Sequence, residues 1–201
     1  MKEVIRQKVQ ETKRQIVVEE VSRIFESEGF HSAKMQEIAK KLGISVGALY
    51  KLFDSKEALY YAYIEHQIRN FHNELVESCP GFDDPVVCLE RYVQLKFEVF
   101  SAKRKAIEDP VVGDPLFFVK MNAQRSDPAR PIFDYLAKLF ESLGRVRPLK
   151  EPNPLKLAYL FNAFTSGYIE YWIHYEERLE DSARQVVEEF LYGMAERKEA
   201  R

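Results

Sequence analysis

Apolar residues recur along most of the chain with the spacing of amphipathic α-helices. Val17, Val21, Ile24 and Phe25 follow an i, i+4, i+7, i+8 pattern that stops before Gly29, a plausible helix-ending residue. Similar runs are Ile64, Ile68, Phe71 and Leu75; Leu89, Val93, Lys96, Phe97 and Phe100; Leu157, Leu160, Phe161 and Phe164; and Val186, Val187, Phe190, Leu191 and Met194. No run shows the two-residue alternation of a strand between turn signals. The pattern therefore predicts an all-α fold of about nine helices.

The prolines indicate where some of these helices begin. All nine lie between Pro80 and Pro154. Five follow an Asp or Asn: Asp84-Pro85, Asp109-Pro110, Asp114-Pro115, Asp127-Pro128 and Asn153-Pro154. An Asx side chain can accept backbone N–H bonds as N-cap, and proline at the first helical position loses no hydrogen bond. These five pairs therefore predict helix starts.

A short helix and a tight turn are expected over residues 32–43. Ser32 is the expected N-cap, and the buried face would consist of Met35, Ile38, Ala39 and Leu42. Ala39 is small, which suits a close crossing of two helices. Gly43 then supplies a residue that tolerates positive φ, so it can end the helix and redirect the chain.

A second helix should follow, capped by Ser45 and buried through Leu49 and Phe53. Its outward face would carry Val46, Gly47, Ala48, Tyr50 and Lys51. The small residues allow a close backbone approach, while the Tyr50 hydroxyl and the Lys51 ammonium can bind phosphate oxygens. This is the arrangement of a helix-turn-helix, whose second helix enters the major groove of DNA.

Further phosphate contacts are expected beside these two helices. Lys34 precedes the first, and Ser55 is a good N-cap for the helix that follows the second. The N–H groups of that helix start, together with Lys56, would form an anion site. The predicted DNA-binding set is Ser32, Lys34, Ser45, Val46, Gly47, Ala48, Tyr50, Lys51 and Lys56.

The segment from Ile16 to Leu59 resembles the N-terminal domain of TetR/AcrR-type transcriptional regulators. The matching positions are Phe25, Gly29, Phe30, Ile38, Ala39, Gly43, Ile44, Ser45, Gly47, Leu49, Tyr50, Phe53, Lys56 and Leu59. Two departures concern phosphate contacts: Ala33 and Lys34 replace the usual hydroxyl residues, and Leu52 replaces a His or Tyr.

This resemblance implies that two parts of the chain have different functions. Residues 1–54 would be the DNA-binding head, and residues 55–201 a body that binds a ligand and dimerises. The last two helices, about residues 155–176 and 182–198, would pair across a two-fold axis. The dimer would repress transcription from a palindromic operator, and a small-molecule effector would shift the fourth helix and release the DNA.

Aromatic residues crowd the predicted body. The candidates for lining an effector pocket are Phe97, Phe100, Phe117, Phe118, Tyr135, Phe164, Tyr168 and Trp172. Each is equally open to an ordinary role in the core or at the dimer contact, because large side chains fill helix bundles. Taken together, these residues favour a bulky apolar or aromatic effector over a sugar or a nucleotide.

The small net charge indicates that DNA affinity would depend on a few placed contacts rather than on bulk charge. The net charge is −2, but residues 1–57 carry 11 basic and 9 acidic side chains, whereas residues 58–201 carry 19 and 23. Basic residues at the start of the chain, such as Arg6 and Arg14, could reach phosphates, although solvated charge is the simpler interpretation. No signal-like or membrane-spanning run is found, so a cytoplasmic protein is expected.

Other kinds of site have little support. Cys79 and Cys88 fit no zinc spacing; they flank a Pro-Gly turn and could be drawn together, although inert buried thiols are the commoner outcome. No metal or cofactor is expected, and no catalytic motif is present. The alternatives to a regulator are a helical enzyme and a dimeric protein whose head does not bind DNA.

Overall fold

A computed structural model describes residues 1–82, 84–102, 127–175, 179 and 182–193. These residues contain eight α-helices, one 3₁₀ turn and no strand, which confirms the all-α prediction. The elements are α1 (Lys2–Ser32), α2 (Met35–Lys41), α3 (Val46–Leu52), α4 (Lys56–Ser78), η1 (Pro80–Phe82), α5 (Pro85–Ala102), α8 (Arg130–Val146), α9 (Pro154–Tyr175) and α10 (Ala183–Tyr192). Within the described ranges, no helix is long and apolar enough to cross a membrane.

The chain divides into two compact units. Among the described residues, the head unit consists of residues 1–70 with 127–128, and the body unit of residues 71–102 and 129–193. The division falls inside helix α4, which is continuous from Lys56 to Ser78. The predicted functional boundary between residues 54 and 55 lies just before that helix.

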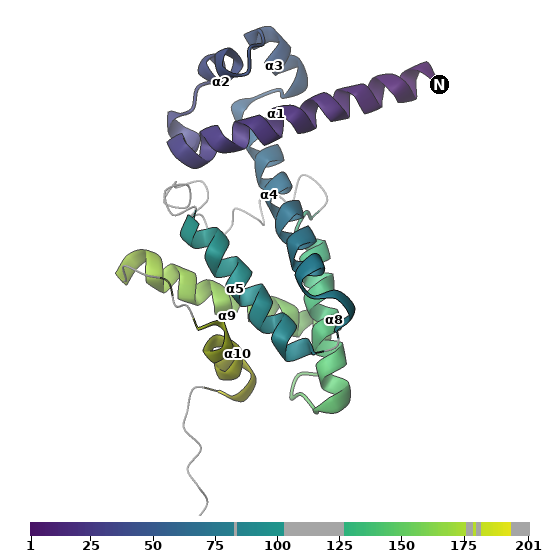
Figure 1. Ribbon diagram of the computed structural model, residues 1–201, viewed down its shortest axis with the longest axis vertical. Helices are drawn as coiled ribbons and strands as arrows, with labels where there is room; N and C mark the ends of the chain where they lie inside the picture. The colour runs from purple at the N-terminus through teal and green to yellow at the C-terminus, as the bar shows by residue number, and fades with distance from the viewer. Residues whose placement is uncertain (83, 103–126, 176–178, 180–181, 194–201) are drawn as a thin grey trace, which may run out of the picture. The chain divides into compact units, whose positions relative to one another are not determined.

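The head unit packs α1 to α4 around one hydrophobic core (Figure 1). Phe25, Ile38, Leu49 and Leu59 come from four different helices, and all are fully buried. The regular part of α1 ends where predicted, because Gly29 has a φ of 76°. One more helical turn follows before the chain enters α2.

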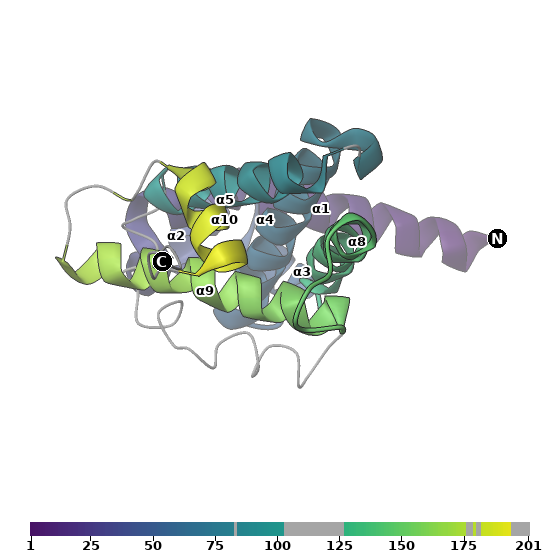
Figure 2. The same ribbon diagram turned by 90° about the horizontal axis from the view of Figure 1, so that it is seen from below.

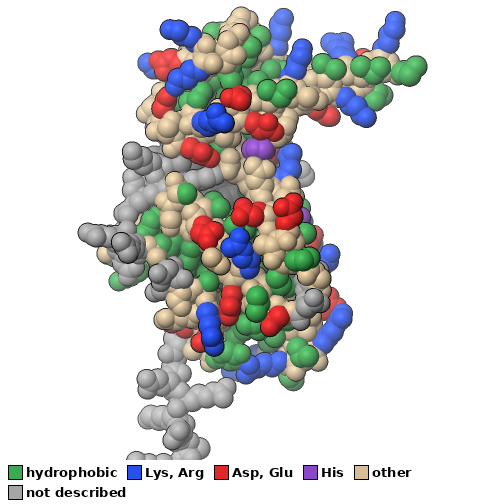
Figure 3. All heavy atoms as spheres, in the orientation of Figure 1, with side chains coloured by type: hydrophobic (Ala, Val, Ile, Leu, Met, Phe, Trp, Pro, Cys, Tyr) green, Lys and Arg blue, Asp and Glu red, His purple; other side chains and the backbone are tan. Residues whose placement is uncertain are grey.

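Helix α1 extends well beyond this core at its N-terminal end (Figure 1). Residues 1–13, which we call the arm, are all exposed, and burial begins only near Val17. The exposed arm side chains include the apolar Val4, Ile5 and Val9. Figure 3 shows Lys and Arg side chains projecting from the same stretch. The arm therefore stays helical as a continuation of the packed part of α1.

The body unit is a helical bundle with its own core. Helix α8 packs along α9, and α10 packs against α5 and α9 (Figure 2). Leu89, Phe140, Phe161 and Val187 are buried at these contacts. The rings of Phe140 and Phe161 meet edge-on, with centroids 5.7 Å apart. Large apolar side chains thus hold this bundle together.

Two of the Asx-Pro helix starts are confirmed. The Asp84 carboxylate accepts the backbone N–H of Val86 at 3.0 Å where α5 begins, and the Asn153 amide oxygen accepts that of Lys156 at 3.1 Å in α9. The prediction for Asp127-Pro128 is wrong by two residues, because α8 starts at Arg130 and uses the following proline in its first turn. Asp109-Pro110 and Asp114-Pro115 lie outside the described residues.

The cysteines correct another expectation. Cys79 and Cys88 form a disulfide with their Cα atoms 5.7 Å apart, instead of remaining as inert thiols. The bridge links the end of α4 to the second turn of α5 across the η1 turn. Gly81 has a φ of 89°, so this turn can reverse the chain tightly enough to bring the two sulfurs together.

Candidate nucleic-acid interface

Helices α2 and α3 form the helix-turn-helix that the sequence predicts. Gly43 has a φ of 66°, and its N–H donates to the Lys40 carbonyl at 3.1 Å. Ser45 caps α3, because its hydroxyl accepts the backbone N–H of Ala48 at 3.1 Å. The turn between the helices is therefore fixed by a glycine and by a side-chain cap.

The two faces of α3 are as predicted except that Val46 and Ala48 are half-buried, with Val46 packed against the head core. Leu49 and Phe53 are buried in the core of the head unit, whereas Tyr50 is 44% exposed and Lys51 is exposed. Gly47 is exposed, and a Cβ placed on it would meet no atom within 4 Å. The Gly47 backbone therefore faces open space beside the only two large side chains of this outward face, which leaves room for a nucleic-acid backbone.

The start of α2 differs from the prediction. Ser32 is exposed in the last turn of α1, and the N-cap position of α2 belongs to Lys34. Ser32 is therefore not the helix cap that was expected. Ala33 is buried in the head core, which explains a small apolar residue at this position. Lys34 is exposed, and its ammonium lies 3.8 Å from the Glu37 carboxylate on the helix surface.

Lys56 has a different role from the one predicted. Its ammonium donates to the carbonyls of Phe30 at 2.8 Å and Ala33 at 3.2 Å, and it lies 4.2 Å from the centre of the Phe30 ring. Hydrogen bonds from the Glu57 backbone N–H and from Ser55 lower the pKa of the Glu57 carboxyl, so a negative charge sits at the start of α4. Lys56 thus caps the end of α1, and the anion site at the start of α4 stays a prediction.

Ser55 itself is confirmed as the N-cap of α4. Its hydroxyl accepts the backbone N–H of Ala58 at 3.1 Å, and its carbonyl accepts that of Leu59 at 3.2 Å. The local signal for a helix start was therefore correct.

Arg14 is a structural residue that the sequence did not reveal as such. Its guanidinium donates to the Leu52 carbonyl at the end of α3 and lies 4.4 Å from the centre of the Phe53 ring. An Arg near a helix-turn-helix suggests a phosphate contact, but here it fixes the C-terminus of α3 against α1. The only sequence signal is an Arg one turn before the buried part of α1.

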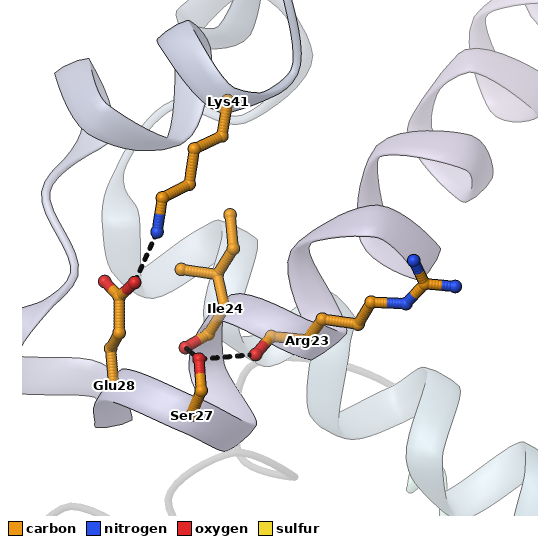
Figure 4. A network of polar contacts seen from close by, with 5 residues as sticks. All are labelled: Arg23, Ile24, Ser27, Glu28 and Lys41. Carbon is orange, nitrogen blue, oxygen red and sulfur yellow. Dashed lines mark hydrogen bonds and ion pairs between the residues drawn. The ribbon is translucent and has the colours of Figure 1, made fainter.

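A second contact ties α2 to α1. The Lys41 ammonium forms an ion pair with the Glu28 carboxylate (Figure 4). On the preceding residue of α1, the Ser27 hydroxyl donates to the Arg23 carbonyl one turn back, at 2.8 Å. The pair is partly exposed, so its contribution to the free energy of unfolding is small. Its effect is to direct Lys41 towards α1, whereas the neighbouring Lys40 remains exposed.

The predicted effector residues fall in the body unit. Phe97 of α5 and Tyr168 of α9 have ring centroids 6.2 Å apart, and Phe164 lies 5.5 Å from Tyr168. Phe100 is half-buried against the same core, and Trp172 is buried. Tyr135 lies elsewhere, with its hydroxyl donating to the Cys79 carbonyl at 3.1 Å. Phe117 and Phe118 lie outside the described residues.

One hollow of the body unit is lined by none of these aromatic residues. This hollow of about 330 Å³ lies beside the junction of α8 and α9, lined by Phe140, Gly144, Leu149 and Leu157 among others. Over the described ranges, no group of three or more His, Cys, Asp or Glu side chains could hold a metal ion.

A head unit with a capped helix-turn-helix and an outward-facing α3 defines a helix-turn-helix protein of the DNA-binding type. Residues 19–63 match the family model described as bacterial regulatory proteins, tetR family. The N-terminal part of the chain is therefore similar to this family, as the sequence resemblance implied. The matched range runs from the packed part of α1 into α4, so it contains the whole helix-turn-helix.

The relatives agree with this assignment. The chain is 24% identical over 191 residues to the uncharacterized HTH-type transcriptional regulator YuxN of Bacillus subtilis, covering 92% of this chain and 65% of YuxN. It is 36% identical over 85 residues to the HTH-type transcriptional regulator UidR of Escherichia coli, covering 42% of this chain and 43% of UidR. The matches thus span less than two thirds of either relative. Both are transcriptional regulators rather than enzymes.

A solved structure shows the same fold over most of the chain. The transcriptional regulator FadR of Bacillus subtilis, crystallised in complex with stearoyl-CoA, aligns with a TM-score of 0.71 at 12% identity. The alignment covers 89% of this chain and 98% of FadR. The likeness therefore includes the helices of the body unit as well as the head.

Proposed function

We propose that this protein is a ligand-responsive transcriptional repressor of the cytoplasm that binds a palindromic operator as a dimer. The observation that carries the proposal is the outward face of α3, where Tyr50 and Lys51 flank the open backbone at Gly47. In a helix-turn-helix this face enters the major groove. The match of residues 19–63 to the tetR family model and the regulator relatives support the same function.

The proposed DNA contacts come from two sides of the helix-turn-helix. Tyr50 and Lys51 would bind from α3, with Val46, Gly47 and Ala48 allowing close approach. Lys34 would bind a phosphate from the start of α2, and the Ser32 and Ser45 hydroxyls would add further contacts. Lys56 is left out of this set, because its donors are directed to carbonyls of α1.

The proposed dimer forms through the last two helices. One face of α9 carries exposed Leu160, Gly167, Tyr171 and Tyr175 at helical spacing. The Tyr171 and Tyr175 rings lie 5.1 Å apart on this face. A run of exposed apolar and small residues is typical of a surface that a second copy covers. Two heads held in this way could reach successive major grooves.

The proposed effector binds in the body unit and is apolar or aromatic in part. Phe97, Phe164 and Tyr168 form a group of rings at the contact of α5 and α9. FadR, which shares the fold, was crystallised with stearoyl-CoA, whose acyl chain is a large apolar group. An effector that binds the DNA-free state more tightly would lower operator affinity by its difference in binding free energy.

The recognition surface can be tested with Tyr50→Ala combined with Lys51→Ala. Using DNA from upstream of the protein's own gene, we expect operator affinity to fall at least about 30-fold, because two contacts of about 1–3 kcal/mol are lost. The slope of log affinity against log salt should also fall by about one unit for Lys51. Fluorescence anisotropy measures both, and circular dichroism checks the helix content.

The matched control is Tyr159→Ala with Lys150→Ala, because Tyr159 is also 44% exposed but lies in the body unit. This control should bind DNA like the parent. If the Tyr50 and Lys51 variant binds as tightly as the parent, α3 is not the recognition helix. If the parent binds no duplex from its own upstream region, the alternative of a head without DNA binding is supported.

A further inference from the structure

A lysine lies inside the body unit at the contact of α5 and α9. Lys96 is only 5% exposed. Its ammonium donates to the Thr165 hydroxyl and the Ser166 hydroxyl, each at 2.9 Å, and to the amide oxygen and backbone carbonyl of Asn162 at 3.0 and 3.1 Å. The Tyr92 hydroxyl donates to the same amide oxygen at 2.8 Å. These five side chains form what we call the Lys96 cluster.

The Lys96 cluster holds a cationic group without a matching anion. All four oxygens around the ammonium are neutral, and no Asp or Glu of the described residues forms an ion pair with it. Burial lowers the pKa of Lys96 to about 7, and burial is the sole cause of that shift. A buried ammonium is costly unless an anion compensates it. A hydrophobic side chain at position 96 would suit the apolar packing of α5.

A ligand oxygen could replace one of the present acceptors of the ammonium. An ammonium has three N–H donors, and four oxygens lie within 3.1 Å of this one. The Thr165 and Ser166 hydroxyls also donate to the Asn162 carbonyl, at 3.0 and 2.8 Å, so they keep a partner if the ammonium turns away. A ligand oxygen can therefore replace one contact without leaving a polar group unsatisfied.

The Lys96 cluster is partly exposed at its edge and lies next to the predicted effector residues. Asn162 and Ser166 are half-buried, so the cluster is not sealed. Phe97 follows Lys96 directly, and Phe100 lies one turn further along α5. On α9, these polar residues occupy the side opposite the exposed Leu160 and Tyr171 face. A ligand here would not compete with the proposed dimer contact.

We propose that Lys96 binds the acidic head group of the effector, an amphiphile whose apolar part lies along Phe97, Phe100 and Tyr168. This proposal rests on the proposed function, because it gives the effector of the regulator a chemical class. A carboxylate or phosphate oxygen would compensate the positive charge of Lys96 through a charge-assisted hydrogen bond. The requirement for an acid is new, since the aromatic residues alone indicate only an apolar ligand.

The test compares acids with alcohols of the same shape. The probes are dodecanoate with dodecanol, and 2-naphthoate with 2-naphthol, titrated into the full-length protein by calorimetry at pH 8 without DNA. We expect at least one acid to bind about tenfold or more tightly than its alcohol, as one charge-assisted hydrogen bond provides. Because Lys96 is largely neutral at this pH, acid binding should take up roughly one proton, which titrations in two buffers reveal.

Variants then assign the effect to one residue. Lys96→Met should abolish the preference for the acid and the proton uptake while leaving alcohol binding unchanged. Lys138→Met, which removes an exposed lysine from α8, is the matched control and should behave like the parent. If Lys96→Met fails to fold, Lys96→Gln and the proton uptake of the parent decide the question.

Three results would overturn the proposal: equal affinity for acids and alcohols, an acid preference that survives in Lys96→Met, or no binding of either acid. Operator binding by the parent is measured separately. A parent that binds its operator but shows one of these three results remains a regulator, and only the assignment of an acidic effector fails. A parent that binds an acid through Lys96 but no DNA contradicts the proposed function instead.

Discussion

At the scale of single residues, two cations of the head unit stabilise helix ends. Lys56 binds the last carbonyls of α1, and Arg14 binds the last carbonyl of α3. Each also lies over an aromatic ring, Phe30 or Phe53, at 4.2 or 4.4 Å. Positive charge favours the carbonyl end of a helix, so both contacts reinforce the helix dipole. These residues hold the ends of α1 and α3 within the head unit.

The charge of Lys96 should make stability depend on pH. Its pKa is about 7 when folded, against 10.5 for the free side chain, so the unfolded chain holds one more proton between these values. The free energy of unfolding should therefore rise from about pH 7 upwards, whereas below pH 7 the cost of the buried charge is fully present. Urea unfolding at pH 7, 8 and 9 measures this trend.

The comparison with Lys96→Met isolates the effect of this group. The difference in unfolding free energy between parent and variant should increase in favour of the parent as the pH rises. Tyr92, the other titratable side chain of the Lys96 cluster, has a pKa raised above its usual value by burial, so it stays protonated over this range. A difference that does not change with pH would show that Lys96 stays charged in the folded protein.

The role of a residue could be predicted from the sequence when it depends only on residues near it in the chain. Ser45, Leu49, Phe53 and Tyr50 were placed correctly, because the helix cap and the 3.6-residue period determine their positions. The role of Lys56 could not be predicted, because the carbonyls that it binds lie more than 20 residues earlier in the chain. They approach Lys56 only in the folded head. The Lys96 cluster could not be predicted for the same reason, since most partners of Lys96 are on another helix.

At the scale of elements, the disulfide is the main feature that the helix pattern did not reveal. It closes a short loop of sequence separation 9 between α4 and α5. Helix starts at Asp84 and Asn153 follow from local chemistry, whereas two cysteines at this spacing fit either a bridge or separate thiols. The folded turn at Gly81 decides between these outcomes.

Removing the disulfide should destabilise the protein measurably. Closing a loop of about ten residues restricts the unfolded chain by about 2–3 kcal/mol. Dithiothreitol should therefore lower the free energy of unfolding of the parent by that amount, as urea titration shows. The Cys79→Ala, Cys88→Ala variant should have the lower value from the start and show no response to the reductant. Detecting two free thiols in the untreated parent would contradict the bridge.

At the scale of the whole molecule, the all-α architecture and the helix-turn-helix followed from periodicity, and the family followed from the segment between Ile16 and Leu59. The division into two compact units could not be predicted from the sequence. It falls inside α4, where the apolar spacing continues without a break. A boundary with no loop leaves no proline or glycine signal. Sequence patterns can locate a helix, but not the point along it where its packing partners change.

The proposed dimer gives a prediction at this scale. Leu160→Asp with Tyr171→Asp places two carboxylates in the exposed face of α9, where burying them against a second copy costs several kcal/mol. Sedimentation equilibrium should then show a monomer, and operator affinity should fall because the two half-sites are no longer bound together. Val146→Asp, at an exposed position of α8, is the control and should remain a dimer. A double variant that also remains dimeric would place the interface elsewhere.

The arm has a consequence for the local stability of α1. Residues 1–13 share one continuous helix with the buried segment around Val21 and Phe25, but they have no core contact of their own. Their backbone hydrogen bonds can open by fraying from Met1, whereas those around Phe25 open only when the head unit itself unfolds. Amide hydrogen exchange along this single helix should therefore slow by orders of magnitude from the arm to the core. A helix that looks uniform in the ribbon is two thermodynamic segments, and the transition between them lies near Arg14.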